Sequence, residues 1–141
     1  MCKCLDKYGP LLGRLLLSAI FIIAGIQKIT DFSGTAAFMA TKGLPLVEVL
    51  LVLTIIVELG GGLMVLFGWQ ARWAAAALFF FVLVVTPIFH PVWSPQDLLP
   101  NYRDFIKNIA IMGGLMYVMV HGSGPLSLGK DWCPEKCAAT K

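Results

Sequence analysis

Residues 44–67 have the sequence LPLVEVLLVLTIIVELGGGLMVLF, an apolar run long enough to cross the hydrocarbon core of a bilayer as a helix. The run contains two charged residues, Glu48 near its start and Glu58 near its middle. A carboxylate near the centre of a membrane-spanning helix is costly, so it needs a cationic partner, a proton or a function. Glu58 is therefore the first candidate for a functional residue.

The composition of the whole chain is that of a membrane protein. Of its 141 residues, 58% are hydrophobic and 13% are charged, whereas soluble domains carry about 25% charged residues. A chain this short cannot bury so much apolar surface in one core, so lipid must cover most of it. The net charge of +3 is scattered rather than gathered in a basic run, which excludes nucleic-acid binding.

Three further apolar runs lie at residues 11–27, 73–89 and about 105–120. None shows the alternation of a barrel strand, and lipid admits only helices or closed barrels. We therefore predict an all-α integral membrane four-helix bundle that forms a single transmembrane domain, residues 1–141, with polar, cysteine-containing termini. The expected helices cover about residues 10–29, 44–68, 72–90 and 104–121. The loop between the first two is expected to carry a short helix that lies in the membrane interface.

Four spans place both termini on the same side of the membrane, and the Lys and Arg residues indicate which side. The side with the termini carries Lys3, Lys7, Arg14, Arg72, Lys130, Lys136 and Lys141. The opposite side carries Lys28, Lys42, Arg103 and Lys107. This excess of cations favours the cytoplasm as the location of both termini.

The polar residues of the predicted helices form two sets that differ in depth. The set near the outer ends comprises Gln27, Lys28, Glu48, His90, Lys107 and Asn108. The deeper set comprises Glu58 and Arg14. The long side chain of Arg14 is expected to extend toward Glu58 from the cytoplasmic side. Gly25, Gly61 and Gly114 share helix faces with these residues, which indicates either that the polar faces point into the bundle or that the glycines serve packing alone.

Each set has a structural and a functional interpretation. Glu58 either pairs with Arg14 and fixes the register of the helices, or serves as a proton relay or ligand contact. Lys28, Glu48 and Lys107 either reach the lipid headgroups with their charged ends or converge with the other polar groups on a pocket.

His90 closes the third predicted helix. It is either an interfacial histidine beside an aromatic anchor, or a titrating group or quinone-oxygen partner near the outer membrane face. No second histidine lies at ligand spacing, and the methionines are better explained as core-filling residues. We therefore expect no haem, flavin or metal site within the bundle.

The four cysteines are all terminal, at Cys2, Cys4, Cys133 and Cys137. In the predicted topology they share the cytoplasmic side, where thiols are mostly reduced. Together they could form a four-thiolate metal site, although their spacing is not the usual Cys-x-x-Cys. A redox pair, lipidation and the absence of a specific role are the alternatives.

Several short motifs follow one another in a specific order along residues 13–128. They are Gly13-Arg14, Gly25-Ile26-Gln27-Lys28, Gly43-Leu44-Pro45, Glu58-Leu59-Gly60-Gly61-Gly62, Phe89-His90 and Phe105-Ile106-Lys107-Asn108. This series resembles the DoxX family of small four-helix membrane proteins. The resemblance implies a bundle in a bacterial or archaeal cytoplasmic membrane and a link to redox complexes, since the family is named after a membrane subunit of a thiosulfate:quinone oxidoreductase. It also implies a polar pocket formed by Arg14, Lys28, Glu58, His90, Lys107 and Asn108.

These observations lead to one main functional hypothesis and two alternatives. The main hypothesis is a membrane subunit of a quinone-linked oxidoreductase or respiratory complex, with quinone as cofactor in a polar pocket around Glu58. The chain shows no redox centre, so a partner membrane or redox subunit would supply the electrons. The first alternative is a non-catalytic membrane anchor or assembly factor for a partner complex, and a homo-oligomer is also compatible with the sequence. A small solute or proton carrier ranks last, because four short helices leave little room for alternating access.

Overall fold

The computed structural model describes residues 3–90 and 98–129, and within these ranges the chain is all-helical, with five helices and no strand. The helices are α1 (Lys3–Thr30), α2 (Phe32–Thr41), α3 (Val47–Phe67), α4 (Ala71–Phe89) and α5 (Leu98–His121). The prediction of an all-α fold is confirmed. The cysteine candidates Cys2, Cys133 and Cys137 lie outside the described residues, and Cys4 lies in the first turn of α1.

Two helices begin earlier in the chain than their apolar runs. α1 starts at Lys3 and continues through Pro10, and α5 starts at Leu98 with Pro100 in its first turn. Pro100 suits the first turn of α5, because the N–H that proline lacks has no intrahelical partner there. Pro10 lies about two turns inside α1, where the missing N–H removes the helix hydrogen bond to the carbonyl of Asp6. Polar residues ahead of both apolar runs therefore extend the helices beyond their apolar parts.

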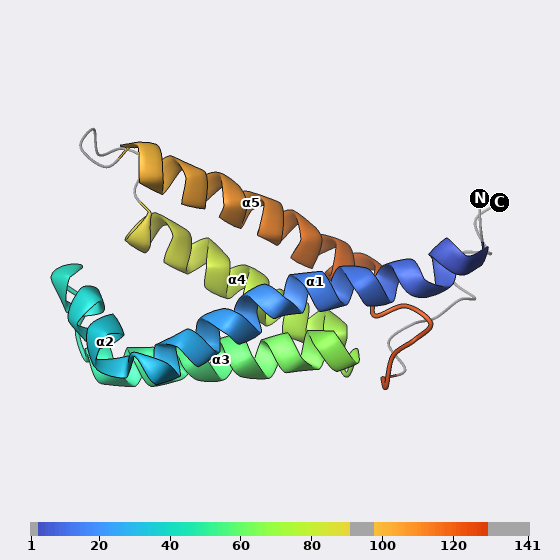
Figure 1. Ribbon diagram of the computed structural model, residues 1–141, viewed down its shortest axis with the longest axis horizontal. Coiled ribbons are helices and arrows are strands. Elements are labelled where there is room, and N and C mark those ends of the chain that lie inside the picture. The colour runs from blue at the N-terminus through green and yellow to red at the C-terminus, as the bar shows by residue number, and fades with distance from the viewer. Residues whose placement is uncertain (1–2, 91–97, 130–141) are drawn as a thin grey trace.

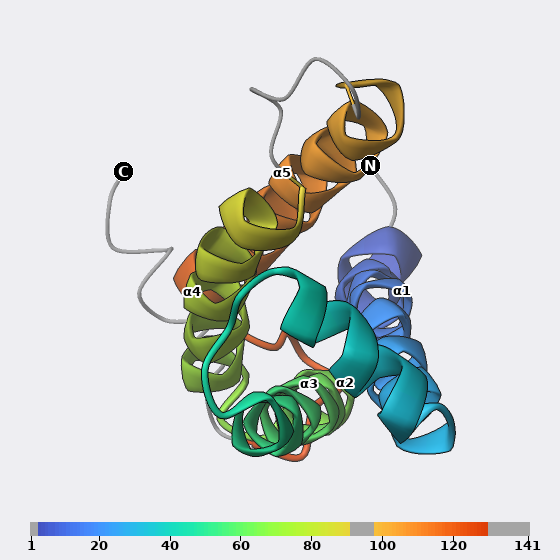
Figure 2. The ribbon, with the colours of Figure 1, turned by 90° about the vertical axis from the view of Figure 1, so that its left-hand side faces the viewer.

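The four long helices form an open arc (Figures 1 and 2). α3 packs against α1 on one side and α4 on the other, and α4 packs against α5. Contacts between α1 and α5 are few, so the arc is not tightly closed. The short helix α2 lies across the end of the molecule where α1 finishes and α3 begins (Figure 1). The start of α1 and the end of α5 lie at the opposite end.

Among the described residues, three helices are long and apolar enough to cross a membrane: Asp6–Thr30 within α1, Val47–Phe67 and Ala71–Phe89. Large apolar side chains point outward along them, and Leu16 and Phe80, for example, are 61% and 60% exposed. Such a surface suits lipid rather than water. The chain is therefore a multi-pass membrane protein. That α5 forms a fourth span and that α2 lies in the interface remain predictions.

Glycines let the helix backbones approach one another closely. A Cβ atom on Gly61 of α3 would lie 2.8 Å from Cγ of Leu78 in α4, and the Leu78 side chain is completely buried. A Cβ atom on Gly25 of α1 would lie 2.6 Å from Cγ of Leu59 in α3. The absence of a side chain at Gly61 and at Gly25 therefore allows α3 to pack closely against both α4 and α1.

We predict that Gly61→Val lowers the melting temperature of the protein in detergent, because the added side chain collides with the buried Leu78 and overpacking costs about 1–3 kcal/mol. Gly60→Val is the matched control, since no heavy atom lies within 4 Å of a Cβ atom at Gly60. Thermal unfolding followed by circular dichroism measures both. Equal losses of stability in the two variants would contradict the packing described.

Candidate functional site

Glu58 forms an ion pair with Lys28. The Lys28 Nζ lies 2.8 Å from Oε2 and 3.0 Å from Oε1 of Glu58, so the ammonium donates to both carboxylate oxygens. The side chain of Glu58 is 7% exposed and that of Lys28 is 25% exposed. The expected pairing of Glu58 with Arg14 is therefore wrong, and the ion pair joins the last turns of α1 to the middle of α3.

The register of α1 against α3 explains why Glu58 pairs with Lys28 and not with Arg14. The two helices lie side by side in opposite directions, with Gly25 facing Leu59. This register brings Lys28 level with the carboxylate. Arg14 precedes Lys28 by about 21 Å along the helix axis and faces Gly68, just beyond the end of α3. Sequence distances within each helix cannot reveal the offset between two helices.

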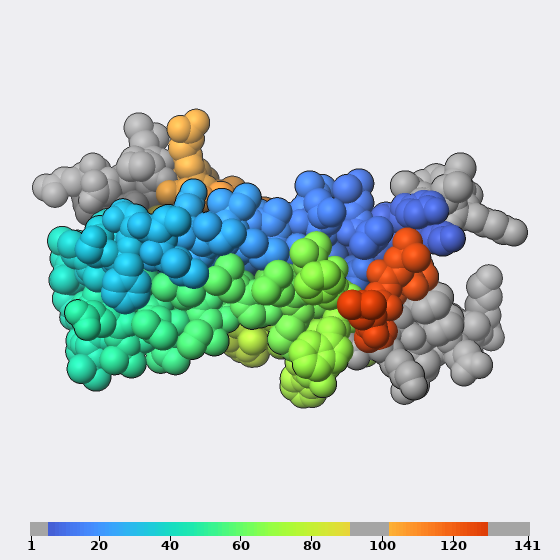
Figure 3. All heavy atoms as spheres, turned by 60° about the horizontal axis from the view of Figure 1, so that its bottom comes forward, coloured from blue at the N-terminus to red at the C-terminus, as the bar shows by residue number. Residues whose placement is uncertain are grey.

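Arg14 is buried, at 2% exposure, and it holds the segment that follows α5. This segment, residues 122–129, is called the C-terminal strap. It lies against the N-terminal part of α1 and the C-terminal end of α3 (red in Figure 3). The Nη2 atom of Arg14 donates a hydrogen bond to the carbonyl of Leu126, and Nη1 lies in the space that a side chain at Gly68 would occupy. Nε and Nη1 have no hydrogen-bond partner among the described residues. Arg14 therefore anchors the strap.

The strap also completes the C-terminal end of α3. The N–H of Leu128 donates to the carbonyl of Phe67 at 3.0 Å, and the N–H of Gly129 donates to that of Gly68 at 3.2 Å. Gly68 has a φ angle of 70°, which glycine adopts without strain. The Arg14 guanidinium beside these last carbonyls complements the negative end of the helix dipole. These interactions were missed in the sequence because most of them involve backbone atoms.

A second group of polar side chains joins α4 to α5. Asn108 Nδ2 donates to Thr86 Oγ1 at 3.0 Å, and Thr86 in turn donates to the carbonyl of Val82 at 2.6 Å. Thr86 is 2% exposed, so this bond lies in the interior. Thr86 was not a candidate from sequence, although its place one turn before His90 could have revealed it.

Near this bond, Asp104 contacts two of the candidate residues. Its Oδ1 atom lies 2.7 Å from Lys107 Nζ, and its Oδ2 atom lies 3.7 Å from His90 Nδ1. We call Lys107, Asp104 and His90 the α4–α5 polar cluster. The ammonium of Lys107 donates a hydrogen bond to the Asp104 carboxylate and neutralises its charge. Asp104 was also missed, although it stands three residues before Lys107 on one helix face.

The seven candidate residues thus occupy separate places rather than one pocket around Glu58. Lys28 pairs with Glu58, His90 and Lys107 meet through Asp104 beside Asn108, Arg14 holds the strap, and Glu48 is exposed in the first turn of α3. Within the described residues, no hydrogen bond or ion pair joins these places. The same part of the chain holds no group of three or more His, Cys, Asp or Glu side chains able to bind a metal ion.

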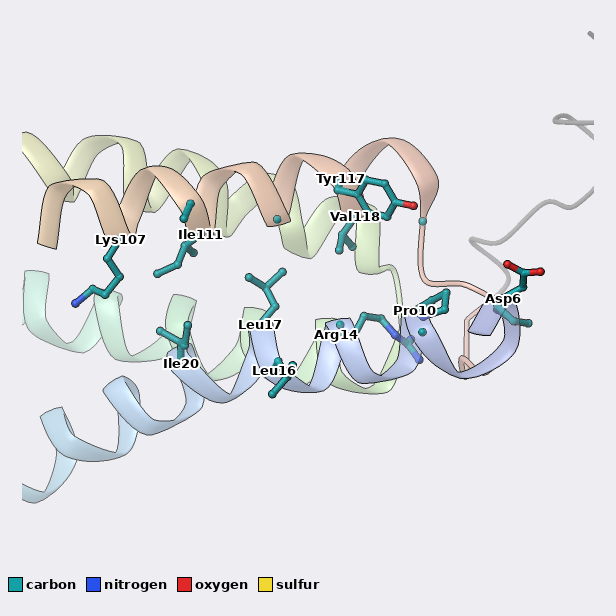
Figure 4. Close-up of a pocket in the computed structure, with 16 residues that line it drawn as sticks. Asp6, Pro10, Arg14, Leu16, Leu17, Ile20, Lys107, Ile111, Tyr117 and Val118 are labelled. Carbon is teal, nitrogen blue, oxygen red and sulfur yellow. The ribbon is translucent and has the colours of Figure 1, made fainter. Parts of the chain in front are cut away.

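A groove lies between α1 and α5 on the described surface, and we call it the α1–α5 groove. Its volume is about 1010 Å³. Apolar side chains such as Leu17, Ile20 and Ile111 line its middle, and Lys107 and Arg14 lie toward its two ends (Figure 4). Lys107 and Arg14 are the candidate residues that line it, whereas Glu58 does not. The groove exists because α1 is held against α3 and makes few contacts with α5.

Comparison with known proteins identifies the family. The family model described as DoxX matches residues 9–91, more than half of the chain. The chain belongs to the DoxX family. It is 36% identical to "Inner membrane protein YqjF" of Escherichia coli (strain K12) over 134 residues, which cover 92% of this chain and 99% of that protein. It is 29% identical to "Inner membrane protein YphA" of the same organism over 122 residues, which cover 85% of this chain and 87% of that protein. No solved structure gives a significant match.

We predict that Glu58→Leu destabilises this DoxX-family protein by about 3 kcal/mol, because it leaves the Lys28 ammonium without its partner. Adding Lys28→Met should restore most of this loss, since an apolar pair suits the interface of α1 and α3. Adding Arg14→Met should restore none. Reversible unfolding in mixed detergent measures all three variants. Restoration by Arg14→Met instead of Lys28→Met would contradict the observed pairing.

We predict that Arg14→Met releases the strap. The amides of Leu128 and Gly129, now bonded to the end of α3, should exchange with deuterium roughly ten- to hundredfold faster, because a hydrogen bond from a charged donor contributes about 1.5–3 kcal/mol. Hydrogen-exchange mass spectrometry of the strap peptide measures this. Arg72→Met, which removes an exposed arginine, is the matched control. Unchanged exchange in Arg14→Met would show that the strap is held by other means.

Proposed function

We propose that this DoxX-family protein is a membrane subunit of a quinone-linked oxidoreductase, and that a quinone binds in the α1–α5 groove. The observation that carries the proposal is the groove itself, about 1010 Å³ in volume, lined mainly by apolar side chains and flanked by cationic ones. Such a volume is at the upper end of the range of small-molecule sites. A quinone needs an apolar slot and a few hydrogen-bond donors for its two carbonyl oxygens, and its isoprenoid tail can continue into the surrounding lipid.

The α4–α5 polar cluster fits the proton chemistry of a quinone. Reduction of a quinone to a quinol consumes two electrons and two protons, and a partner subunit with a redox centre supplies the electrons. Lys107 lines the groove and contacts Asp104, which faces His90. An imidazole can accept a proton at one ring nitrogen and release one from the other. We therefore assign to this line of side chains the transfer of protons between water at the end of α4 and the quinone oxygens.

Glu58 has a structural role in this proposal. It does not line the groove, and its carboxylate is neutralised by Lys28. The ion pair holds α1 against α3, and α1 is the wall of the groove that faces α5. Glu58 therefore acts on quinone binding through the position of α1, and not by contact with the ligand.

We infer that the protein lies in the inner, cytoplasmic membrane with both termini in the cytoplasm. In this arrangement α1, α3, α4 and α5 are the four spans, and α2 lies in the interface. Both relatives from Escherichia coli bear the name "Inner membrane protein". α5 runs back along α4, as a fourth span must (Figure 1), and the excess of Lys and Arg on the side of the termini supports their cytoplasmic location.

We predict that Gly13→Leu weakens the binding of decylubiquinone to the protein in nanodiscs about tenfold or more, a loss of about 1.4 kcal/mol. Gly13 lines the groove, and no heavy atom lies within 4 Å of a Cβ atom there, so leucine fills the groove without a collision. Equilibrium titration of decylubiquinone measures the affinity.

Gly113→Leu is the matched control, because Gly113 of α5 is equally open but does not line the groove. It should bind decylubiquinone as the wild type does. If Gly13→Leu also retains the affinity of the wild type, the groove is not the site. If the wild type does not bind decylubiquinone, the quinone proposal is wrong.

A non-catalytic anchor is the second candidate function. The backbone of α1 is open at Gly9 and Gly13, which stand four residues apart and both line the groove. Small residues at this spacing allow a second helix to pack closely. If the groove holds a helix of a partner protein, Gly13→Leu should release the partner during purification and leave the quinone content of the sample unchanged.

A further inference from the structure

We propose that the quinone head lies at the Lys107 end of the α1–α5 groove, with Lys107 as its hydrogen-bond donor, and that the isoprenoid tail runs toward the Arg14 end. This inference rests on the proposed function. It adds the direction of the ligand and the residue that recognises its head, which follow from a comparison of the two ends of the groove.

The Arg14 end offers the neutral Tyr117 hydroxyl as its accessible donor, because the guanidinium of Arg14 is buried. The Arg14 side chain is 2% exposed, its Nη2 atom is bonded to the carbonyl of Leu126, and its Nη1 atom lies against Gly68. The guanidinium could turn toward a ligand only by releasing the strap. Asp6 also lines this end, and its carboxylate can only accept hydrogen bonds, as quinone carbonyls do. With a carboxylate and a neutral hydroxyl, this end is less favourable for a quinone carbonyl than the cationic Lys107 end.

Lys107 has the opposite properties. Its side chain is 58% exposed and lines the groove. An ammonium has three N–H donors, and the contact observed for Lys107 is with Asp104 on the same helix, at 2.7 Å. Lys107 can therefore donate to a quinone carbonyl without giving up this contact.

Asp104 is the positioning residue of this arrangement. A lysine near the end of a membrane-spanning helix tends to extend toward the lipid headgroups. The bond to Asp104 opposes this movement and keeps the ammonium close to the groove. Further groups face Asp104, namely His90 from α4 and Arg103 from its own helix, so this end of the groove is polar. The middle of the groove, at Ile20, Ile111 and Leu17, suits the tail.

Photolabelling tests the direction of the ligand. The probe is a ubiquinone analogue with an azide on its ring, added to the protein in nanodiscs with and without excess decylubiquinone. Labelled peptides are mapped by mass spectrometry. We expect labelling that decylubiquinone suppresses on residues 104–108 of α5, at the Lys107 end of the groove (Figure 4).

The two ways of failing are distinguishable. Suppressible labelling on residues 6–10 and 117–125 would overturn the assigned direction and leave the quinone site in the groove. Labelling that decylubiquinone does not suppress anywhere would overturn the proposed function, and the inference with it.

Affinity measurements test the assigned residues. Lys107→Met should weaken decylubiquinone binding about tenfold, which is the effect of losing about 1.4 kcal/mol. Arg103→Met is the control, because it removes a cation from the same helix end but outside the lining of the groove. Equal effects of these two variants would show that only the general charge matters and would overturn the role of Lys107.

The role of Asp104 requires a separate comparison. Asp104→Asn should weaken binding and spread the photolabel along α5, because Lys107 is no longer held. Asp104→Glu keeps the carboxylate and should restore both the affinity and the labelling pattern. If Asp104→Asn changes the melting temperature but not the labelling pattern, Asp104 is a structural residue and does not position Lys107.

Discussion

The ion pair between Lys28 and Glu58 is the constraint on which the arrangement of the helices depends. Lipid cannot solvate either charge, so each must find the other across the interface of α1 and α3. The pair has well-formed geometry, with both carboxylate oxygens within 3.0 Å of the ammonium. Together with the close approach at Gly25, it sets the register of the two helices. A shift of one turn would move Lys28 about 5 Å along the axis and break the pair.

The groove is a consequence of this register. α1 is bound along α3, and α5 is bound along α4 through the bond from Asn108 to Thr86. Within the described residues α1 and α5 make few contacts, among them the approach of Leu17 to Gly114. The strap closes one end of this arrangement, since Arg14 binds it and it caps α3. The chain thus keeps a groove of about 1010 Å³ between α1 and α5.

The sequence predicted the properties that each helix carries by itself. The hydropathy of the apolar runs predicted the all-α fold, and the isolated carboxylate at Glu58 predicted a buried ion pair or a site. The partner of Glu58 was predicted wrongly as Arg14, because the offset between two helices depends on side-chain packing at positions such as Gly25 and Leu59. The strap was missed because Leu126 contributes a backbone carbonyl, which any residue possesses.

The groove could not be predicted for a different reason. It results from the absence of packing between two helices that are each apolar, and no pattern within α1 or α5 reports that absence. Lys107 illustrates the difficulty: its position at the start of an apolar run fits both an extension to the headgroups and a site contact. Its location beside the groove, with Asp104 at 2.7 Å, is visible only in the structure.

The most direct test of the account is the quinone content of the native protein. The protein is extracted from its own membrane into native nanodiscs, and the lipid extract is quantified by mass spectrometry against discs that hold an unrelated membrane protein. The account predicts about one quinone per protein above the background of the control discs. Quinone at the background level, in samples that retain their co-purifying partners, would contradict it and favour the non-catalytic anchor.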